Sequence, residues 1–553
     1  MRDPHVPRSR RSGIDRRWSL CLIILRKAGQ HRALAVLGFG LLGFLGSMLV
    51  SLFQGVPQPS VHDEFAYLLA GETFAEGRLT NSTHPHWEHF ETFHVLHEPT
   101  YQAKYPPGQG LLLAAGLRAT GHPVAGVWLG AGLFSAAVAW ALLVWLPPAW
   151  AVLTALFCML QISWFSYWSY SYWGGAVAGV GGGLVFGSYW AMRDKPEVLH
   201  GILLGTGLGI LASSRPLEGA IAGGLIASAL VLRLFRETSR RRCDLTLRSL
   251  LPAGIVLGLF LMALGIYNHR VTGSVTTFPY QVFQAQYAAS PPFWFQALPD
   301  SIPDYRHAEI ERYWLEWGRA RHEHMQSLPR LSHHLAGSLT RHLIFFLGPG
   351  LLALIGLTLM RPRSSDLRLP FLALVAVMSV SLATKSAWPH YVAPVAVVFY
   401  ILMGAGLRSL HRKARRHRTA NPAPVILVGC LAWLLLFPGS ALDPGNVSFA
   451  GDRADLERHL QDLPGNHLVL VEYEEDHNVH REWVYNRADI DAAPVVWARA
   501  MGTERDQELR QYFDERTHWL LKVGGEVEFK LISEAPSRGS LPSTTRKTGV
   551  NVR

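Results

Sequence analysis

Two adjacent acids, Asp63 and Glu64, lie in a polar stretch, residues 54–108, that separates two apolar runs. This stretch ends with Lys104 and the sequence Tyr105-Pro106-Pro107-Gly108, just before the second apolar run. A carboxylate can accept a proton from a reacting hydroxyl, and a lysine can hold an anion. A lipid-facing connector needs neither group, so the stretch is predicted to form a catalytic surface. The alternative is that the acids only complement the dipole of a helix N-terminus.

Composition places the chain in a lipid bilayer. Of its 553 residues, 49% are hydrophobic and 17% are charged, and the apolar residues fall in blocks of membrane-spanning length. The formal charge of +11 comes from Arg and Lys residues at the ends of these blocks, where retention on the cytoplasmic side accounts for them, so no nucleic-acid partner is expected. The four cysteines show no CxxC spacing and predict neither a zinc site nor a disulfide framework.

The fold class predicted from these blocks is a polytopic α-helical membrane protein with about eleven transmembrane helices. The predicted spans cover residues 33–53, 124–145, 150–165, 174–192, 199–212, 217–235, 251–267, 342–360, 370–384, 391–407 and 425–437. They belong to a transmembrane domain, residues 33–440, with outer loops at 54–122 and 268–341. The segment 109–119 is too short to cross and is predicted to be an interfacial helix.

Loop charges set the predicted orientation. Residues 1–32 are basic and are expected in the cytoplasm, and an odd number of spans places nearly all later loop arginines on the same side. The C-terminal region then lies outside. Residues 441–530 are predicted to form a small α/β domain, because they combine short strand-like runs with a charged helical run, and residues 531–553 are expected to be disordered. The strand-like runs are 467–472, 495–498 and 519–523, and the helical run is 504–515.

This layout resembles the GT-C membrane glycosyltransferases, and most closely the bacterial relatives of the protein O-mannosyltransferases and lipid A aminoarabinose transferases. The acid pair with a following aromatic matches Asp63-Glu64-Phe65-Ala66-Tyr67. The family's lysine before a proline pair matches Lys104, although Tyr105 intervenes here. The resemblance implies a bacterial inner-membrane enzyme with a periplasmic C-terminal domain and a polyprenyl-phosphate-linked sugar as donor.

The resemblance also implies roles for the acids. Transfer of a sugar to a hydroxyl acceptor needs a base, because the nucleophile loses its proton as an oxocarbenium-like centre develops. The family pattern assigns this base to Asp63. Glu64 would then orient Asp63 or help to hold a divalent cation.

Departure of a phosphate requires positive charge nearby. Lys104, Arg215 and Lys385 are the outer-side cations close to membrane edges, and His390 and Tyr391 follow the last of them. These five residues are predicted to bind the donor phosphate. The alternative is that the cations snorkel at the interface, or that Arg215 simply pairs with nearby Glu218.

Aromatic and histidine residues complete the candidate site. Tyr67 and Tyr105 in the first loop, and Tyr280 and Tyr287 in the second, are predicted to contact substrate, although the second-loop aromatics can equally pack against the C-terminal domain. His84 and His86 are weak candidates for metal ligands, because no HExxH-like spacing accompanies them and a flexible polar loop explains them as well.

Three functions fit these features. The favoured one is an inverting glycosyltransferase that moves a sugar from a polyprenyl-phosphate donor to a hydroxyl acceptor on the periplasmic side. A transporter or flippase of lipid-linked glycans is the second, although the acids lie in an outer loop and not at the bilayer midplane. A non-catalytic envelope assembly protein is the third, and it would not need the acids of the first loop.

Overall fold

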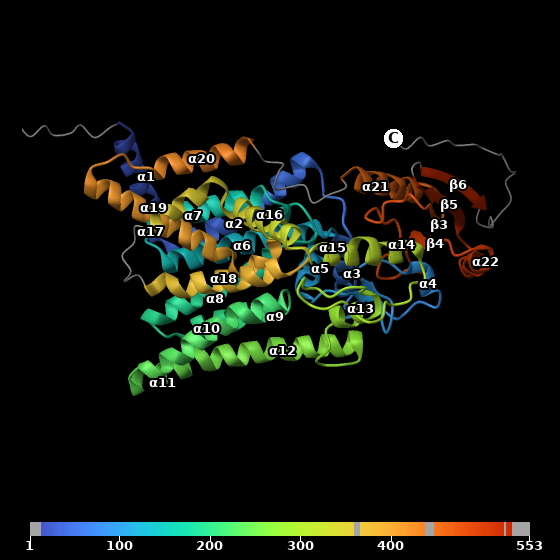
Figure 1. Ribbon diagram of the computed structural model, residues 1–553, viewed down its shortest axis with the longest axis horizontal. Coiled ribbons are helices and arrows are strands. Elements are labelled where there is room, and N and C mark those ends of the chain that lie inside the picture. The colour runs from blue at the N-terminus through green and yellow to red at the C-terminus, as the bar shows by residue number, and fades with distance from the viewer. Residues whose placement is uncertain (1–12, 359–364, 437–446, 525–526, 534–553) are drawn as a thin grey trace, which may run out of the picture.

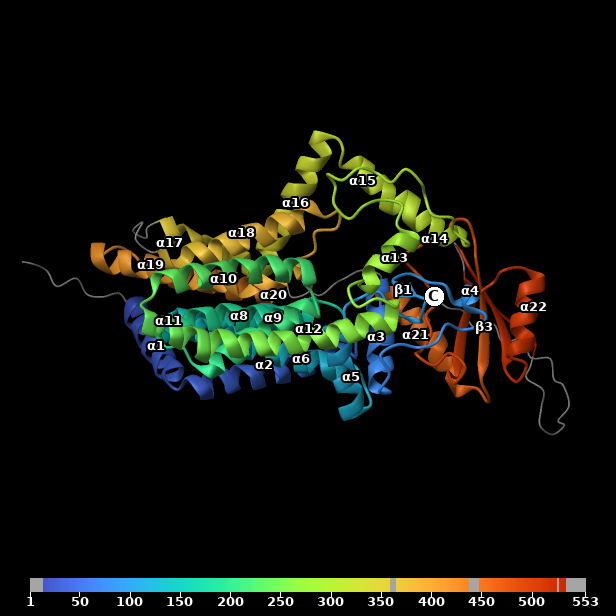
Figure 2. The ribbon, with the colours of Figure 1, turned by 90° about the horizontal axis from the view of Figure 1, so that it is seen from below.

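A computed structural model describes residues 13–358, 365–436, 447–524 and 527–533 of the chain. A long helical bundle forms one end of the molecule, and a C-terminal unit of sheet and helices forms the other (Figure 1). The helices of the two large loops lie between them, and the view in Figure 2 shows the second loop arching away from the bundle before it returns.

A helix lies at each predicted span. They are α2 (Arg32–Gln54), α6 (Val124–Trp145), α7 (Pro148–Cys158), α8 (Ala176–Asp194), α9 (Val198–Ala212), α10 (Pro216–Arg236), α12 (Leu251–Thr272), α16 (Leu328–Leu347), α18 (Arg368–Ala383), α19 (Ala396–His417) and α20 (Ala423–Leu436). Within the described residues, six helical segments are long and apolar enough to cross a bilayer, and four more apolar helices are shorter. The chain is therefore a multi-pass membrane protein, whereas the number of eleven crossings stays a prediction. The helices that were not predicted include α1 (Gly13–Gln30) in the basic N-terminal segment and α11 (Ser239–Leu245) before α12.

Helix α19 forms the centre of the bundle, with every residue from Ala396 to Leu407 buried. The 3₁₀ turn before it, Pro389–Val395, packs closely on α8. A Cβ atom on Gly182 of α8 would lie 2.1 Å from the carbonyl oxygen of Pro394, so only glycine permits this approach. The contact fixes the position of the turn that carries His390 and Tyr391.

The first loop contains α3 (His62–Ala75), α4 (Trp87–Phe90), the short antiparallel strands β1 (Val95–Leu96) and β2 (Gln102–Ala103), and α5 (Gly108–Thr120). Helix α5 covers the segment predicted to be interfacial, and it is not among the helices with the length and apolarity of a span. The second loop contains α13 (Pro279–Tyr287), α14 (Ala308–Arg312), a π-helical segment (Tyr313–Arg319) and α15 (Ala320–His324).

The C-terminal unit consists of α21 (Val447–Asp462), α22 (Thr503–Tyr512) and a four-stranded sheet of order β4-β3-β5-β6. Its strands are β3 (His467–Tyr473), β4 (Val495–Arg499), β5 (Thr517–Val523) and β6 (Val527–Ser533). Strand β3 runs parallel to β4 and β5, and β6 is antiparallel to β5. Strands β3 to β5 and α22 occupy the predicted positions. Strand β6 reaches into the segment predicted to be disordered, of which 534–553 lies outside the described residues.

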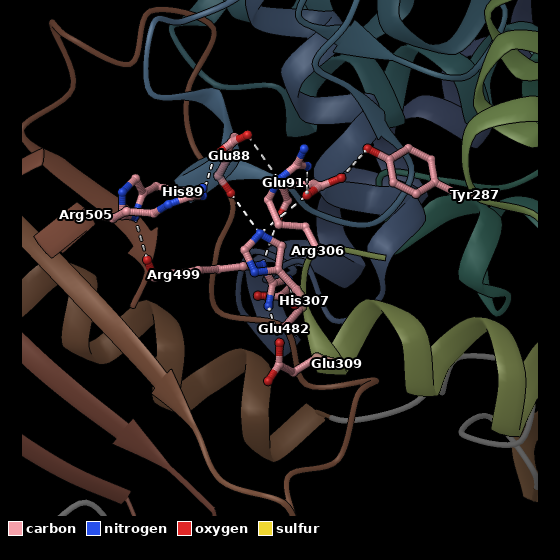
Figure 3. Close-up of polar contacts among 10 residues, drawn as sticks. All are labelled: Glu88, His89, Glu91, Tyr287, Arg306, His307, Glu309, Glu482, Arg499 and Arg505. Atoms are coloured by element: carbon pink, nitrogen blue, oxygen red, sulfur yellow. Dashed lines mark hydrogen bonds and ion pairs between the residues drawn. The ribbon is translucent and has the colours of Figure 1, made fainter. Parts of the chain in front are cut away.

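A buried charge network joins this unit to both loops (Figure 3). Arg499 at the end of β4 is 1% exposed, and its guanidinium donates to Glu482 at 2.5 Å, to Glu309 at 3.1 Å and to the carbonyl oxygen of Glu91 at 2.7 Å. The carboxylate of Glu91 accepts hydrogen bonds from Arg306 at 3.0 Å and from the Tyr287 hydroxyl at 2.7 Å. Since these residues come from the first loop, the second loop and the sheet, the network holds all three in one arrangement.

Replacement of Arg499 by Met should destabilise the protein by about 3–5 kcal/mol, because it leaves the 1% exposed Glu482 as an unpaired buried charge. Thermal unfolding in detergent measures the loss. Arg505, whose half-exposed side chain pairs with Glu88, is the matched control, and R505M should change stability by about 1 kcal/mol or less. The double variant R499M/E482M should recover much of the loss. Equal unfolding temperatures for R499M and R505M would contradict the assignment.

Candidate active site

Asp63 lies in the first turn of α3, and its side chain is 27% exposed. The hydroxyl of Tyr105 donates a hydrogen bond to Asp63 Oδ1 at 2.5 Å. His94 Nδ1 lies 3.5 Å from Asp63 Oδ2 and 3.0 Å from the Tyr105 hydroxyl oxygen. One carboxylate is thus held from two sides and still reaches solvent.

His94 continues this set of contacts into the second loop. Its Nε2 lies 3.3 Å from the hydroxyl of Tyr313 in the π-helical segment. Because the Tyr105 proton is directed at Asp63, a neutral His94 that carries its proton on Nδ1 and accepts from Tyr313 satisfies every contact. His94 also has a positive φ of 64°, which is uncommon for a residue other than glycine and is often found at active sites.

The surroundings keep Asp63 charged. Burial alone would raise the pKa of Asp63, but His94, Lys104 and the Tyr105 hydroxyl together hold it well below its ordinary value. Burial lowers the pKa of His94 to about 4, and the Lys104 charge acts in the same direction. At neutral pH the site therefore holds an ionised carboxylate beside a neutral imidazole.

Lys104 follows β2, and its backbone N–H donates to the carbonyl oxygen of His94 at 3.1 Å, so the small hairpin sets both residues beside α3. Its side chain is 5% exposed, and Nζ lies 4.7–5.5 Å from the ring centres of Tyr105, Tyr280 and Phe283. Burial lowers the pKa of Lys104 to about 7 against the opposing effect of Asp63. No carboxylate within the described residues lies within 4.0 Å of this ammonium group. Lys104 is therefore a cation that an incoming anion can pair with.

Arg215 precedes α10, and its guanidinium lies 4.7 Å above the ring of Tyr391. It lines a small hollow together with Tyr67, whose ring stacks on that of Tyr105 at 4.5 Å. Gly108 connects the two halves of this site, because its N–H donates to the carbonyl oxygen of Ser213 at 2.8 Å and a Cβ atom would collide there. Lys104 and Arg215 are thus brought to the same tyrosine cluster.

The pairing of Arg215 with Glu218, the alternative considered above, is not observed. The described residues contain no ion pair between these two side chains, although Glu218 is buried and close enough for its charge to act on the arginine. Arg215 therefore keeps its hydrogen-bond donors available on the side of the hollow.

Glu64 points away from Asp63. Its Oε2 accepts hydrogen bonds from the N–H and hydroxyl of Ser60 at 2.8 and 3.1 Å, and Oε1 accepts from the N–H of Tyr172 at 2.9 Å. Burial raises the pKa of Glu64 to about 7, and these hydrogen bonds oppose the rise. The Glu64 carboxylate therefore fastens the start of α3 to the segment that contains Tyr172, and these hydrogen bonds go to other residues than Asp63. A role of Glu64 in orienting Asp63 or holding a cation stays a prediction.

Three other predicted residues lie in different surroundings. His390 is 2% exposed, and its Nδ1 lies 2.8 Å from the Tyr167 hydroxyl, so it supports the turn that carries Tyr391. The ammonium group of Lys385 donates to the Ser290 hydroxyl at 2.5 Å, which ties this turn to the second loop. Tyr287 belongs to the Glu91 network and not to the Asp63 site. Tyr280, in contrast, lies beside Lys104, and its contact with substrate stays a prediction.

The histidine-rich part of the first loop docks the C-terminal unit. His84 Nε2 lies 3.1 Å from Asp491, and its Nδ1 accepts from the N–H of His86. The His86 ring packs on Tyr512 of α22. Across the described parts of the chain, no group of three His, Cys, Asp or Glu side chains is arranged to hold a metal ion. The structure therefore gives no support to a cation at His84, His86 or Glu64.

His94 and Tyr313 are the site residues that the sequence did not single out. His94 is one of several histidines in the loop, and no spacing distinguishes it. Tyr313 lies 219 residues further along the chain, so only the fold brings the two together. Tyr172 also reaches the site from a distant segment, through its N–H bond to Glu64.

No family model and no curated protein matches the sequence. Among solved structures, ArnT from Cupriavidus metallidurans in the apo state superposes with a TM-score of 0.50 at 13% identity, over 88% of this chain and 93% of that one. The same protein bound to undecaprenyl phosphate gives a TM-score of 0.46 at 14% identity, over 88% and 93% of the two chains. The archaeal oligosaccharyltransferase AglB from Archaeoglobus fulgidus gives 0.43 at 11% identity, over 78% and 62%.

At this level of identity, the likeness to apo ArnT establishes the fold. It extends over nearly the whole of both chains. The protein thus shares the fold of ArnT.

Proposed function

We propose that this protein is a GT-C glycosyltransferase that moves a sugar from a polyprenyl-phosphate donor to a hydroxyl acceptor, with inversion of the anomeric carbon. The observation that carries the proposal is the arrangement at Asp63. The Tyr105 hydroxyl binds the ionised, partly exposed Asp63 carboxylate, Lys104 lies against the Tyr105 ring, and Tyr67, which stacks on Tyr105, lines the hollow with Arg215. Neither cation has a carboxylate partner of its own among the described residues. A sugar-phosphate donor suits this arrangement, because its phosphate can pair with the two cations and its sugar can be transferred to an acceptor that the carboxylate deprotonates.

The two cations bind and stabilise the phosphate. Lys104 offers an ammonium group from an aromatic pocket, and Arg215 offers its guanidinium from the hollow that it shares with Tyr67. A fixed positive charge is most effective where surrounding side chains exclude water, and both cations are largely shielded by tyrosine rings. As the bond between the sugar and the phosphate oxygen breaks, the phosphate leaves with the electron pair and its charge is neutralised there.

Asp63 acts on the acceptor. The acceptor hydroxyl attacks the anomeric carbon from the side opposite the phosphate, and its proton passes to the Asp63 carboxylate. Because the pKa of Asp63 is low, the carboxylate first orients the hydroxyl and takes the proton late, when the forming bond has made that proton acidic. A single displacement from the far side inverts the configuration of the sugar.

His94 and Tyr105 position the base. Tyr105 holds one oxygen of Asp63, and His94 lies against the other while it bonds to Tyr313. The carboxylate thus keeps one orientation without losing its charge. This arrangement favours an enzyme over a flippase of lipid-linked glycans, because transport does not require a fixed carboxylate next to the phosphate site.

The proposed setting is the bacterial inner membrane. With the N-terminus in the cytoplasm, both large loops and the C-terminal unit lie on the periplasmic side, where nucleotide sugars are absent and a lipid-linked donor is required. The short distance between the site and the interfacial helix α5, which follows Lys104 directly, suits a donor whose phosphate emerges from the bilayer.

Replacement of Asp63 by Asn should lower transfer by about 10²–10⁴-fold, because the amide cannot accept the proton. Envelope glycans from cells that carry the variant as their only copy can be compared by mass spectrometry. The control is E76Q at the exposed end of α3, which should transfer normally. Transfer by D63N at the rate of E76Q would rule out the base, and accumulation of an unflipped precursor in D63N cells would favour transport.

Binding of undecaprenyl phosphate should weaken as the pH rises from 7 to 9, by about tenfold or more, because Lys104 loses its proton above pH 7 while the phosphate keeps its charge. In K104R the dependence should disappear, since arginine stays protonated throughout this range. Calorimetric titration of the purified protein in detergent measures both. The control is K385R, because burial lowers the pKa of Lys385 to about 8 but its ammonium group bonds to Ser290. A pH dependence that persists in K104R and vanishes in K385R would place the phosphate elsewhere.

A further inference from the structure

A second set of rings and cations leads outward from Asp63 along the second loop. Tyr313, Trp317 and Arg321 follow one another at intervals of four residues in the helical run 308–324. The middle of this run is π-helical, a conformation that often occurs at functional sites. Trp317 and Arg321 have no role in the reaction proposed above, either at the base or at the phosphate.

The contacts of these residues form a continuous surface. The rings of Tyr313 and Trp317 stack with centres 5.0 Å apart and an angle of 28°. His480 of the C-terminal unit lies against both rings, at 5.3 Å from Trp317 and 5.8 Å from Tyr313. Tyr313 is buried where it meets His94, whereas Trp317, His480 and Arg321 are partly exposed. The surface therefore opens to solvent as it leaves Asp63.

Arg321 lies at the outer end of this surface, and Arg341 of α16 is close enough for its charge to act on Arg321. The guanidinium of Arg321 lies 5.5 Å from the ring centre of Trp317, and that of Arg341 lies 4.9 Å from the ring centre of Trp388. Their charges repel each other, which together with burial lowers the pKa of Arg321. No carboxylate in the described parts of the chain lies within 4.0 Å of either group, although Arg319 on the same run is paired with Glu323. Two like charges held together without an acid favour an anionic ligand.

We propose that Tyr313, Trp317 and His480 with Arg321 and Arg341 form an acceptor site for a sugar that carries a phosphate or carboxylate group. The sugar ring lies against the faces of Trp317 and His480, and its anionic substituent pairs with the two arginines. An acceptor hydroxyl is then directed along Tyr313 and His94 to Asp63.

The rings of this surface reach Asp63 by a different set of contacts from those of the donor cations, as an acceptor site requires. Lys104 and Arg215 meet the site through Tyr105, Tyr67 and Tyr391, whereas Trp317 meets it through Tyr313 and His94. In an inverting displacement, the acceptor and the leaving phosphate lie on opposite sides of the anomeric carbon. The inference rests on the proposed function, because it takes Asp63 as the point of transfer.

Ligand binding by the purified full-length protein tests the acceptor site. The detergent-solubilised protein is first saturated with undecaprenyl phosphate, so that Lys104 and Arg215 are occupied. Glucose 6-phosphate, glucuronate, methyl glucoside and inorganic phosphate are then compared by saturation-transfer NMR titration. At least one of the two acidic sugars should bind about tenfold more tightly than both methyl glucoside and inorganic phosphate. The acidic sugar that binds identifies the preferred substituent.

Variants locate the site. R321M should weaken acidic-sugar binding by about tenfold, the size expected for loss of one charged hydrogen bond, and R321K should retain most of it. W317A should weaken binding similarly. The matched control is R319M, which removes a paired arginine from the same helical run and should bind normally. All four variants should bind undecaprenyl phosphate as the wild type does, which shows that they are folded.

Two results would overturn the acceptor site: equal binding of methyl glucoside and the acidic sugars, or equal acidic-sugar binding by R321M and R319M. Failure of the proposed function has a different signature. In that case K104M would bind undecaprenyl phosphate as tightly as the wild type, whatever the sugars do.

Discussion

The Asp63 carboxylate keeps its charge in a largely buried setting, and the rest of the site is arranged to make this possible. A carboxylate removed from water normally takes up a proton, unless hydrogen bonds and opposite charges stabilise the ionised form. Tyr105 provides the hydrogen bond, His94 fills the second side and Lys104 provides the charge. In return, Lys104 lies so deep that it is only partly protonated at neutral pH. The site thus balances one anion against cations that remain free to hold a second anion.

The outer parts of the molecule maintain this balance. Glu64 fastens the first turn of α3 to the loop after α7, and Gly108 fastens the Lys104 segment to Ser213, next to Arg215. On the other side, the Arg499 network holds the C-terminal unit and both loops together. The C-terminal unit is therefore part of the site's framework. It also contributes directly, since His480 lies against Tyr313 and Trp317.

Sequence patterns were sufficient to predict the helices and strands whose formation depends on local composition. Long apolar runs and their flanking charges gave the helices, and β-branched runs gave strands β3 to β5. The placement of Lys104 near Asp63 also followed, because both lie in one loop and match a family motif. The role of a residue could not be predicted from the sequence where it depends on the direction of the side chain. Adjacent acids look alike in sequence, yet Asp63 contacts Tyr105 and His94, whereas Glu64 accepts three hydrogen bonds from Ser60 and Tyr172.

Contacts between segments that are distant along the chain could not be predicted from the sequence either. Tyr287 and Tyr280 are seven residues apart in one aromatic run, but only Tyr280 lies beside Lys104, because α13 directs Tyr287 to Glu91. Lys385 was expected at the phosphate and instead bonds to Ser290. His94 gained its importance from Tyr313, a partner that no spacing in the sequence could reveal.

The central claim is that Lys104 and Arg215 hold a lipid phosphate beside the Asp63 carboxylate. An experimental structure of the full-length protein with undecaprenyl phosphate, determined by cryo-electron microscopy, tests it most directly. We expect phosphate density within hydrogen-bond reach, about 3 Å, of both Lys104 Nζ and the Arg215 guanidinium, with the prenyl chain leading toward the bilayer. Phosphate density in contact with neither cation would contradict it.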